Sequence, residues 1–91
     1  ICGLFVLSSL VISQTVEDLI KQGDVAYDAF DNAVALTAYS QAVALDSSNC
    51  EALWKASRAH IDVGEKGDKD SQRIHYYSAE ALARKAVAVK P

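Results

Sequence analysis

The chain has 91 residues, of which 51% are hydrophobic and 23% are charged, and it contains one proline and four glycines. This composition is that of one small globular domain or of part of a larger protein. The formal net charge of −3 excludes the strongly basic class of protein that binds nucleic acid. Abundant alanine and few β-branched runs after residue 16 favour helix over sheet.

Residues 1–13, ICGLFVLSSLVIS, form an uncharged and mostly apolar segment. A membrane span needs roughly 20 apolar residues, whereas a run of this length is typical of the apolar region of a signal peptide. Val11 and Ser13 are small or apolar, as the −3 and −1 positions of a cleavage site before Gln14 require. We therefore expect an exported protein, periplasmic or secreted, after cleavage. The alternatives are an uncleaved segment that anchors the protein to a membrane, which is the only membrane contact we expect, and a buried core helix.

Residues 16–49 carry the pattern of two helices joined by a turn. Apolar residues recur at helical spacing in two runs, 16–30 and 35–45, and polar turn formers follow each run. Thr15 followed three residues later by Asp18 predicts a capping box at the start of the first helix. The sequence therefore predicts a helical hairpin.

Residues 50–91 repeat this pattern, because the segment SAEALARKAVAVKP aligns with VALTAYSQAVALDS. A hairpin of this size buries little surface alone and needs stacked neighbours, so we predict an all-α fold of packed hairpins. Because the chain begins without methionine and ends on proline after a helical pattern, we also expect it to be a fragment of a longer protein. The matched pairs are Leu19 with Leu53, Gly23 with Ser57, Ala35 with Ala79, Tyr39 with Ala83, and Ala42 with Ala86.

The second hairpin contains a ten-residue insertion at about 64–73, with the sequence GEKGDKDSQR. It holds two glycines and six charged residues. We expect a connector in water, with Gly64 ending one helix and Asp70 or Ser71 starting the next, longer one.

The two units resemble the tetratricopeptide repeat, a unit of about 34 residues that forms a helix, a turn and a helix. The resemblance implies antiparallel helical hairpins stacked as a short right-handed solenoid. The insertion and the surrounding EALWKASRAHIDVG are similar to the regulator of microtubule dynamics family, whose bacterial relatives have a signal followed by repeats. Ser47 departs from the usual proline, and Ser57 and Ala83 are also unusual. The resemblance is carried by Gly23, Ala35, Tyr39 and Ala42 in the first unit, and by Ala79, Ala86 and Pro91 in the second.

The resemblance also implies a concave face that binds a peptide or helix of a protein partner. An acidic first half of this face and Arg58 in the second suit a partner with a basic end. A solvated acidic stripe of Asp24, Asp28 and Asp31 is the alternative for the two aspartates, and core or inter-repeat packing is the alternative for Trp54. The clamp of chaperone-binding repeats is absent, since Ile20 and Asp24 replace its lysine and asparagine. The concave positions are Ile20, Asp24, Tyr27, Asp28, Trp54, Arg58 and Asp62.

The sequence gives no support to catalysis, a metal site or a cofactor. Asp62, Asp68 and Asp70 lack the ligand spacing of a calcium loop. His60 and His75 have no Cys or His within one helical turn, so we interpret them as ordinary helix-surface histidines. We expect a non-catalytic interaction scaffold, and the alternative is a structural spacer or oligomerisation module of a larger exported or membrane-anchored protein.

Overall fold

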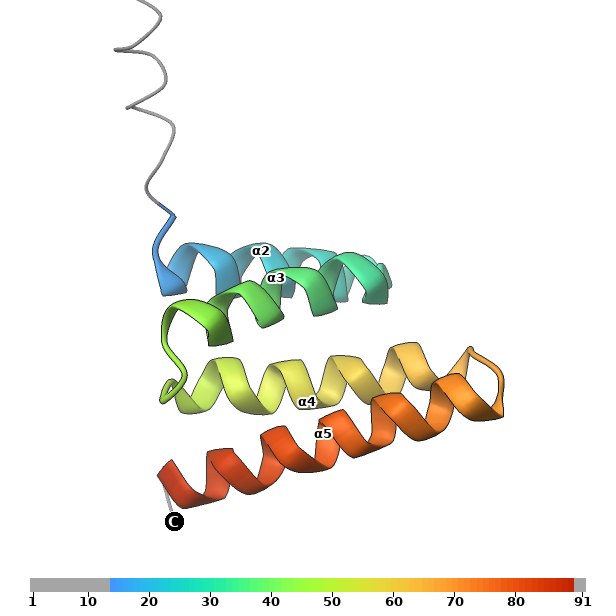
Figure 1. Ribbon diagram of the computed structural model, residues 1–91. Helices are drawn as coiled ribbons and strands as arrows, with labels where there is room; N and C mark the ends of the chain where they lie inside the picture. The colour runs from blue at the N-terminus through green and yellow to red at the C-terminus, as the bar shows by residue number, and fades with distance from the viewer. Residues whose placement is uncertain (1–13, 90–91) are drawn as a thin grey trace, which may run out of the picture.

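The computed structural model describes residues 14–89, which form four α-helices (Figure 1). No strand occurs in this range, which confirms the predicted all-α class. The apolar segment at residues 1–13, predicted to be a signal, lies outside the described residues. Within the described part, no helix has the length and apolar character needed to cross a bilayer. The helices are α2 at Val16–Asp28, α3 at Asn32–Leu45, α4 at Cys50–Glu65 and α5 at Lys69–Val89.

The helices pack in chain order, each against the next, and α2 also contacts α4. Short turns join them, so neighbouring helices are antiparallel: α2 and α3 form the first hairpin, and α4 and α5 form the second below it (Figure 1). Small side chains let the helices approach closely, and the matched alanines of both hairpins are buried. These alanines are Ala35 and Ala79, which are 0% and 3% exposed, and Ala42 and Ala86, which are 0% and 6% exposed.

Each of the first three helices begins at a residue whose side chain accepts a hydrogen bond from a backbone N–H in the first turn. Thr15 Oγ1 accepts from the Asp18 N–H at 3.1 Å, and Asp18 Oδ2 accepts from the Thr15 N–H at 3.2 Å. The predicted capping box is therefore confirmed. Asp31 caps α3 and Asn49 caps α4 in the same way.

The turn of the first hairpin places Phe30 in the left-handed region, with φ of 62°. The Asp31 N–H donates to the Ala26 carbonyl at 2.9 Å, which closes the end of α2. Glycine is the usual residue at such a position, because a side chain is strained there. Phe30 is also 86% exposed, so packing does not offset this strain.

The connector predicted at about 64–73 is shorter in the structure and spans residues 66–68, while the predicted longer helix after it is confirmed as α5. The two hairpin turns have the same length, and the extra residues lengthen the helices: α2 and α3 have 13 and 14 residues, α4 and α5 have 16 and 21. Gly64 does not end α4. It is buried where the helices approach closely, since a Cβ there would lie 2.9 Å from His75 Cβ. α5 begins earlier than predicted because Asp68 Oδ1 accepts from the Ser71 N–H at 2.8 Å.

Candidate functional site: a groove between α2 and α4

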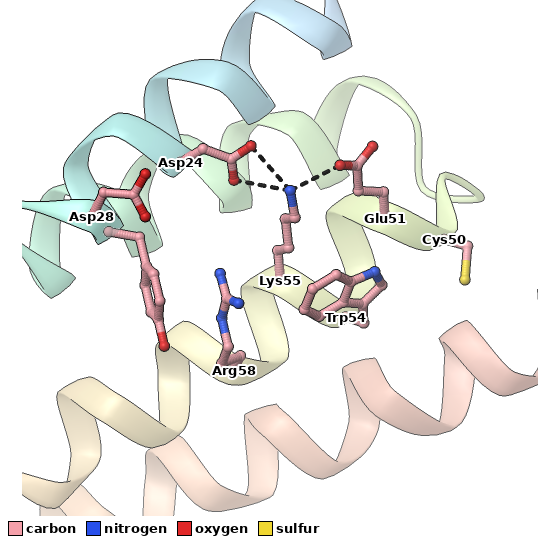
Figure 2. A pocket seen from close by; sticks show the side chains of 8 residues that line it. Asp24, Asp28, Cys50, Glu51, Trp54, Lys55 and Arg58 are labelled. Atoms are coloured by element: carbon pink, nitrogen blue, oxygen red, sulfur yellow. Dashed lines mark hydrogen bonds and ion pairs between the residues drawn. The ribbon is translucent and has the colours of Figure 1, made fainter.

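The α2 and α4 helices line an open groove with a volume of about 630 Å³ (Figure 2). We call it the α2–α4 groove. Its side chains recur at spacings of three and four residues, which places them on one face of each helix. The lining residues are Asp24, Tyr27 and Asp28 from α2, and Cys50, Glu51, Trp54, Lys55 and Arg58 from α4.

The structure brings five of the seven predicted site residues together in this groove. The other two are not part of its lining, although burial and the neighbouring Asp62 together raise the pKa of Tyr27. Ile20 is 5% exposed and belongs to the core, so the expectation that it faces a partner is wrong. Asp62 is half-buried outside the lining, and its Oδ2 is buried without a hydrogen-bond partner. The five are Asp24, Tyr27, Asp28, Trp54 and Arg58.

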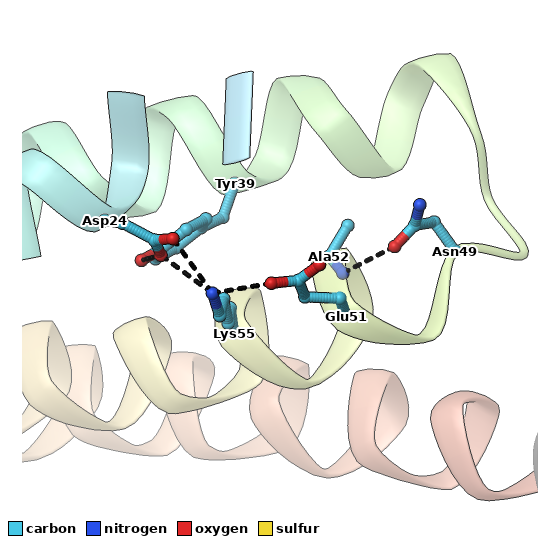
Figure 3. A network of polar contacts seen from close by, with 6 residues as sticks. All are labelled: Asp24, Tyr39, Asn49, Glu51, Ala52 and Lys55. Carbon is cyan, nitrogen blue, oxygen red and sulfur yellow. Dashed lines mark hydrogen bonds and ion pairs between the residues drawn. The ribbon is translucent and has the colours of Figure 1, made fainter. Parts of the chain in front are cut away.

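One wall of the groove is an ion-pair network centred on Lys55 (Figure 3). Lys55 Nζ lies 2.9 and 3.0 Å from the two carboxylate oxygens of Asp24, and 2.8 Å from Glu51 Oε2. The Tyr39 hydroxyl donates to Asp24 Oδ1 at 2.6 Å. The network therefore joins α2, α3 and α4, and Asp24 is engaged inside the protein.

This network shifts the ionisation of its members. Burial alone would raise the pKa of Asp24, but hydrogen bonds from Tyr39 and Lys55 outweigh it and lower that pKa below its usual value. Burial alone would lower the pKa of Lys55, yet its bonds to Glu51 and Asp24 raise it. Burial and the Asp24 carboxylate together raise the pKa of Tyr39. At neutral pH the ion pair is therefore fully charged.

The middle of the groove holds a stacked arginine. The Arg58 guanidinium carbon lies 3.7 Å from the centroid of the Tyr27 ring and 5.0 Å from that of Trp54. Its Nε is buried without a hydrogen-bond partner. Among residues 14–89 it forms no salt bridge with any carboxylate. The groove thus offers aromatic faces and a cation stacked on them.

Sequence reasoning missed Lys55 and Glu51 as a network. A signal was present, because the two residues are four apart and of opposite charge on a predicted helix. The contact with Asp24 had no such signal, since it spans 31 residues and depends on how the second hairpin packs on the first.

The interpretation of the two histidines as unpartnered surface residues is wrong. His60 Nδ1 and His75 Nδ1 lie 2.9 Å apart across the second hairpin. The ring centroids are 5.2 Å apart, so the rings point at each other head-on, as in an N–H···N hydrogen bond. Burial, with a smaller contribution from His75, lowers the pKa of His60. Sequence spacing did not show this pair, because the residues are 15 apart on two helices.

Within the part of the chain that the structure describes, no three histidine, cysteine or acidic side chains gather as a metal site. Comparisons with protein-family models, curated proteins and solved structures found no match to the chain. The chemistry of the groove therefore carries the argument about function.

Proposed function

We propose that the protein is a non-catalytic scaffold of the tetratricopeptide type, whose hairpins stack as a right-handed solenoid. In this proposal the α2–α4 groove binds a peptide or helix of a protein partner. The supporting observation is that two helices bring an exposed tryptophan, a stacked arginine and a free carboxylate into one groove. From the apolar segment at residues 1–13 we further propose that this binding occurs outside the cytoplasm, in the periplasm or after secretion.

Trp54 is the main apolar contact in this proposal. Its side chain is 44% exposed, and the cations of Lys55 and Arg58 lie 5.6 and 5.0 Å from its ring. A large aromatic ring held at the edge of a groove is the kind of residue that dominates binding energy at interfaces. An apolar side chain of the partner would cover this ring and exclude water from it.

Asp28 sets the charge of the partner. It is exposed at the end of α2, and among the described residues it takes part in no ion pair. Asp24 does not attract a basic residue of the partner in this way, because Lys55 neutralises its carboxylate. The groove therefore suits a segment with an apolar side chain for Trp54 and a basic residue for Asp28.

The test is a selection of displayed peptides against the chain, followed by fluorescence titration. Trp54 is the only tryptophan, so its emission reports contact with the groove alone. Selected peptides should be enriched in a basic residue near an apolar one and should shift the emission of Trp54. Replacing Asp28 with lysine (D28K) should weaken binding about tenfold or more by reversing the charge.

The matched control is Glu65→Lys. Asp28 and Glu65 are the last residues of α2 and α4, so the two changes have the same effect on a helix dipole. Glu65 lies outside the groove, and E65K should bind as the unchanged protein does. Peptides that leave Trp54 emission unchanged, or that bind D28K equally well, would refute the proposed face.

A further inference from the structure

The His60 and His75 rings meet end to end between the two helices of the second hairpin. Their Nδ1 atoms lie 2.9 Å apart, and their ring centroids lie 5.2 Å apart. The centroid separation exceeds the nitrogen separation by nearly the combined reach of the two rings, so both nitrogens and both centroids lie close to one line. Each Nδ1 therefore directs its N–H bond or its lone pair along this line, toward the other nitrogen.

Two imidazole nitrogens on one line are also the donor set of a linear, two-coordinate metal ion. Neutral imidazole is the commonest metal ligand in proteins, and it suits copper. Monovalent ions with a filled d shell, such as Cu⁺ and Ag⁺, bind two donors on opposite sides. A structural Zn²⁺ ion instead takes four ligands in a tetrahedron, and within residues 14–89 no three histidine, cysteine or acidic side chains gather. The geometry of the pair therefore favours a monovalent soft ion over Zn²⁺.

The surroundings of the pair leave room for such an ion. A bond from an imidazole nitrogen to a metal is about 2 Å long, so the two nitrogens must separate to about 4 Å and each ring must move by about 0.5 Å. The His60 ring borders an open groove of about 340 Å³ between α3 and α5, which gives it space to move. Among the described residues that line this groove, none other than His60 is ionisable, so no cation there repels the ion. They are Ser40, Val43, Ala56, Ser78, Ala81 and Leu82.

We propose that His60 and His75 form a linear site for Cu⁺, with Ag⁺ as its chemical analogue. In the free protein one ring carries its proton on Nδ1 and the other on Nε2, which lets one Nδ1 donate to the other. On binding, the first ring passes its proton through water to its own Nε2, so that both Nδ1 lone pairs bind the ion. No proton is gained or lost and no electron is transferred. The site shares no residue with the α2–α4 groove and does not depend on the function proposed there.

The test is a calorimetric titration of the untagged chain with silver nitrate in a buffer without chloride. Serine replaces Cys2 and Cys50 in every protein tested, because thiolates also bind these ions, and the chain contains no methionine. This parent chain should bind one Ag⁺, and binding should raise its unfolding temperature. His75→Gln (H75Q) should weaken binding at least about tenfold, because one of two ligands is lost. Zn²⁺ should bind the parent chain at least about tenfold more weakly than Ag⁺ does.

The matched control combines H75Q with Ala88→His, which keeps two histidines but separates them. Ala88 is exposed, and its end of α5 lies beside the start of α4, where Cys50 Sγ lies 3.8 Å from the Ala86 carbonyl oxygen. This variant should bind Ag⁺ as weakly as H75Q does, and circular dichroism should show that both variants keep their helices. Binding by the control that equals binding by the parent chain would overturn the proposal. So would a parent chain that binds no Ag⁺, or one that binds Zn²⁺ as tightly as Ag⁺.

Discussion

At the scale of single residues, Lys55 links the hairpins more than any other polar side chain described here. Its ammonium group lies between Asp24 of α2 and Glu51 of α4, and its side chain is only 12% exposed. A residue of this kind stabilises the fold only while its partners are charged. The depressed pKa of Asp24 means that this stability is present above about pH 3.9, the unfolded value, and is lost as the pH falls through the folded value.

We therefore predict that Lys55→Ala lowers the free energy of unfolding at neutral pH by about 1–3 kcal/mol, because Asp24 loses a charged partner. This loss of unfolding free energy should be smaller at about pH 3. As the pH falls, the Asp24 carboxylate takes up a proton first in the unfolded chain and then in the folded one, so it no longer needs a charged partner. Urea denaturation at the two pH values measures both quantities.

The control for this prediction is Arg84→Ala, which removes an ion pair with Glu80 at a similar distance, 2.9 Å, on the protein surface. Arg84 and Glu80 are 78% and 56% exposed, so the change should lie within about 0.5 kcal/mol of zero. If Lys55→Ala and Arg84→Ala lowered the unfolding free energy equally, burial of the Lys55 ion pair would not explain its contribution to stability.

At the scale of helices, the two hairpins fill the same pair of positions differently, with a glycine and a tyrosine in the first and with a serine and an alanine in the second. Gly23 in α2 leaves room for the buried Tyr39 ring of α3, whereas Ser57 in α4 and Ala83 in α5 line one open groove. The tyrosine needs the glycine, because a Cβ at residue 23 would overlap the ring. The two pairs are alternative solutions for packing one helix against the next.

This pairing predicts a strong coupling between two substitutions. Gly23→Ser alone should destabilise the protein by overpacking, and Tyr39→Ala alone should cost about 3–5 kcal/mol by leaving a cavity. The double variant, which copies the pair of the second hairpin, should cost less than the sum by about 1–3 kcal/mol. Chemical denaturation of all four proteins measures the coupling.

A distant pair serves as the comparison. Combining Gly23→Ser with Arg84→Ala should give additive losses, because Arg84 lies on the exposed side of α5. Additive losses for the Gly23 and Tyr39 pair as well would show that the ring can move aside.

The pair of histidines gives the second hairpin a pH dependence. The lowered pKa of His60 means that the folded chain binds fewer protons than the unfolded chain below about pH 6.5. Stability is therefore complete above that value and falls as the pH falls through the folded pKa. The groups around His60 are His75 and Ser78 of α5 and Ser40 of α3, and none of them carries a negative charge.

We predict that the unfolding free energy decreases between about pH 7.5 and about pH 5, and that His60→Gln reduces this decrease, because the amide has no proton to take up in this range. His75→Gln should have an intermediate effect, since it removes the charge of the neighbour and leaves His60 buried. A profile that is identical in His60→Gln and the unchanged protein would show that His60 stays solvated.

At the scale of the whole molecule, the helices were predictable from the sequence and the contacts between them were not. The spacing of Thr15 and Asp18 and the matched alanines predicted the helices and the buried stripe, because those signals are local or periodic. The exact helix ends within the insertion were not predictable, since its glycines and charges favour a longer loop in isolation. A glycine is found at position 64 inside α4 because His75 and Tyr76 of α5 lie close to it. Such contacts between helices cannot be predicted from the local sequence pattern.

Contacts between helices also explain why the candidate groove was only partly predictable from the sequence. Helical spacing placed Asp24 and Asp28 on one face, and that is where they lie. Spacing did not show that Lys55 reaches Asp24 or that Ile20 is buried, because both depend on how deeply α4 sits against α2 and α3.

The order in which the helices pack also has a kinetic consequence. Every major contact joins helices that follow each other in the chain, so the loops that must close during folding are short. Proteins with such contacts fold within microseconds to milliseconds. Because the lengthened α4 and α5 make the most extensive of these contacts, we expect folding to begin in their hairpin and the shorter first hairpin to complete its structure by packing onto α4.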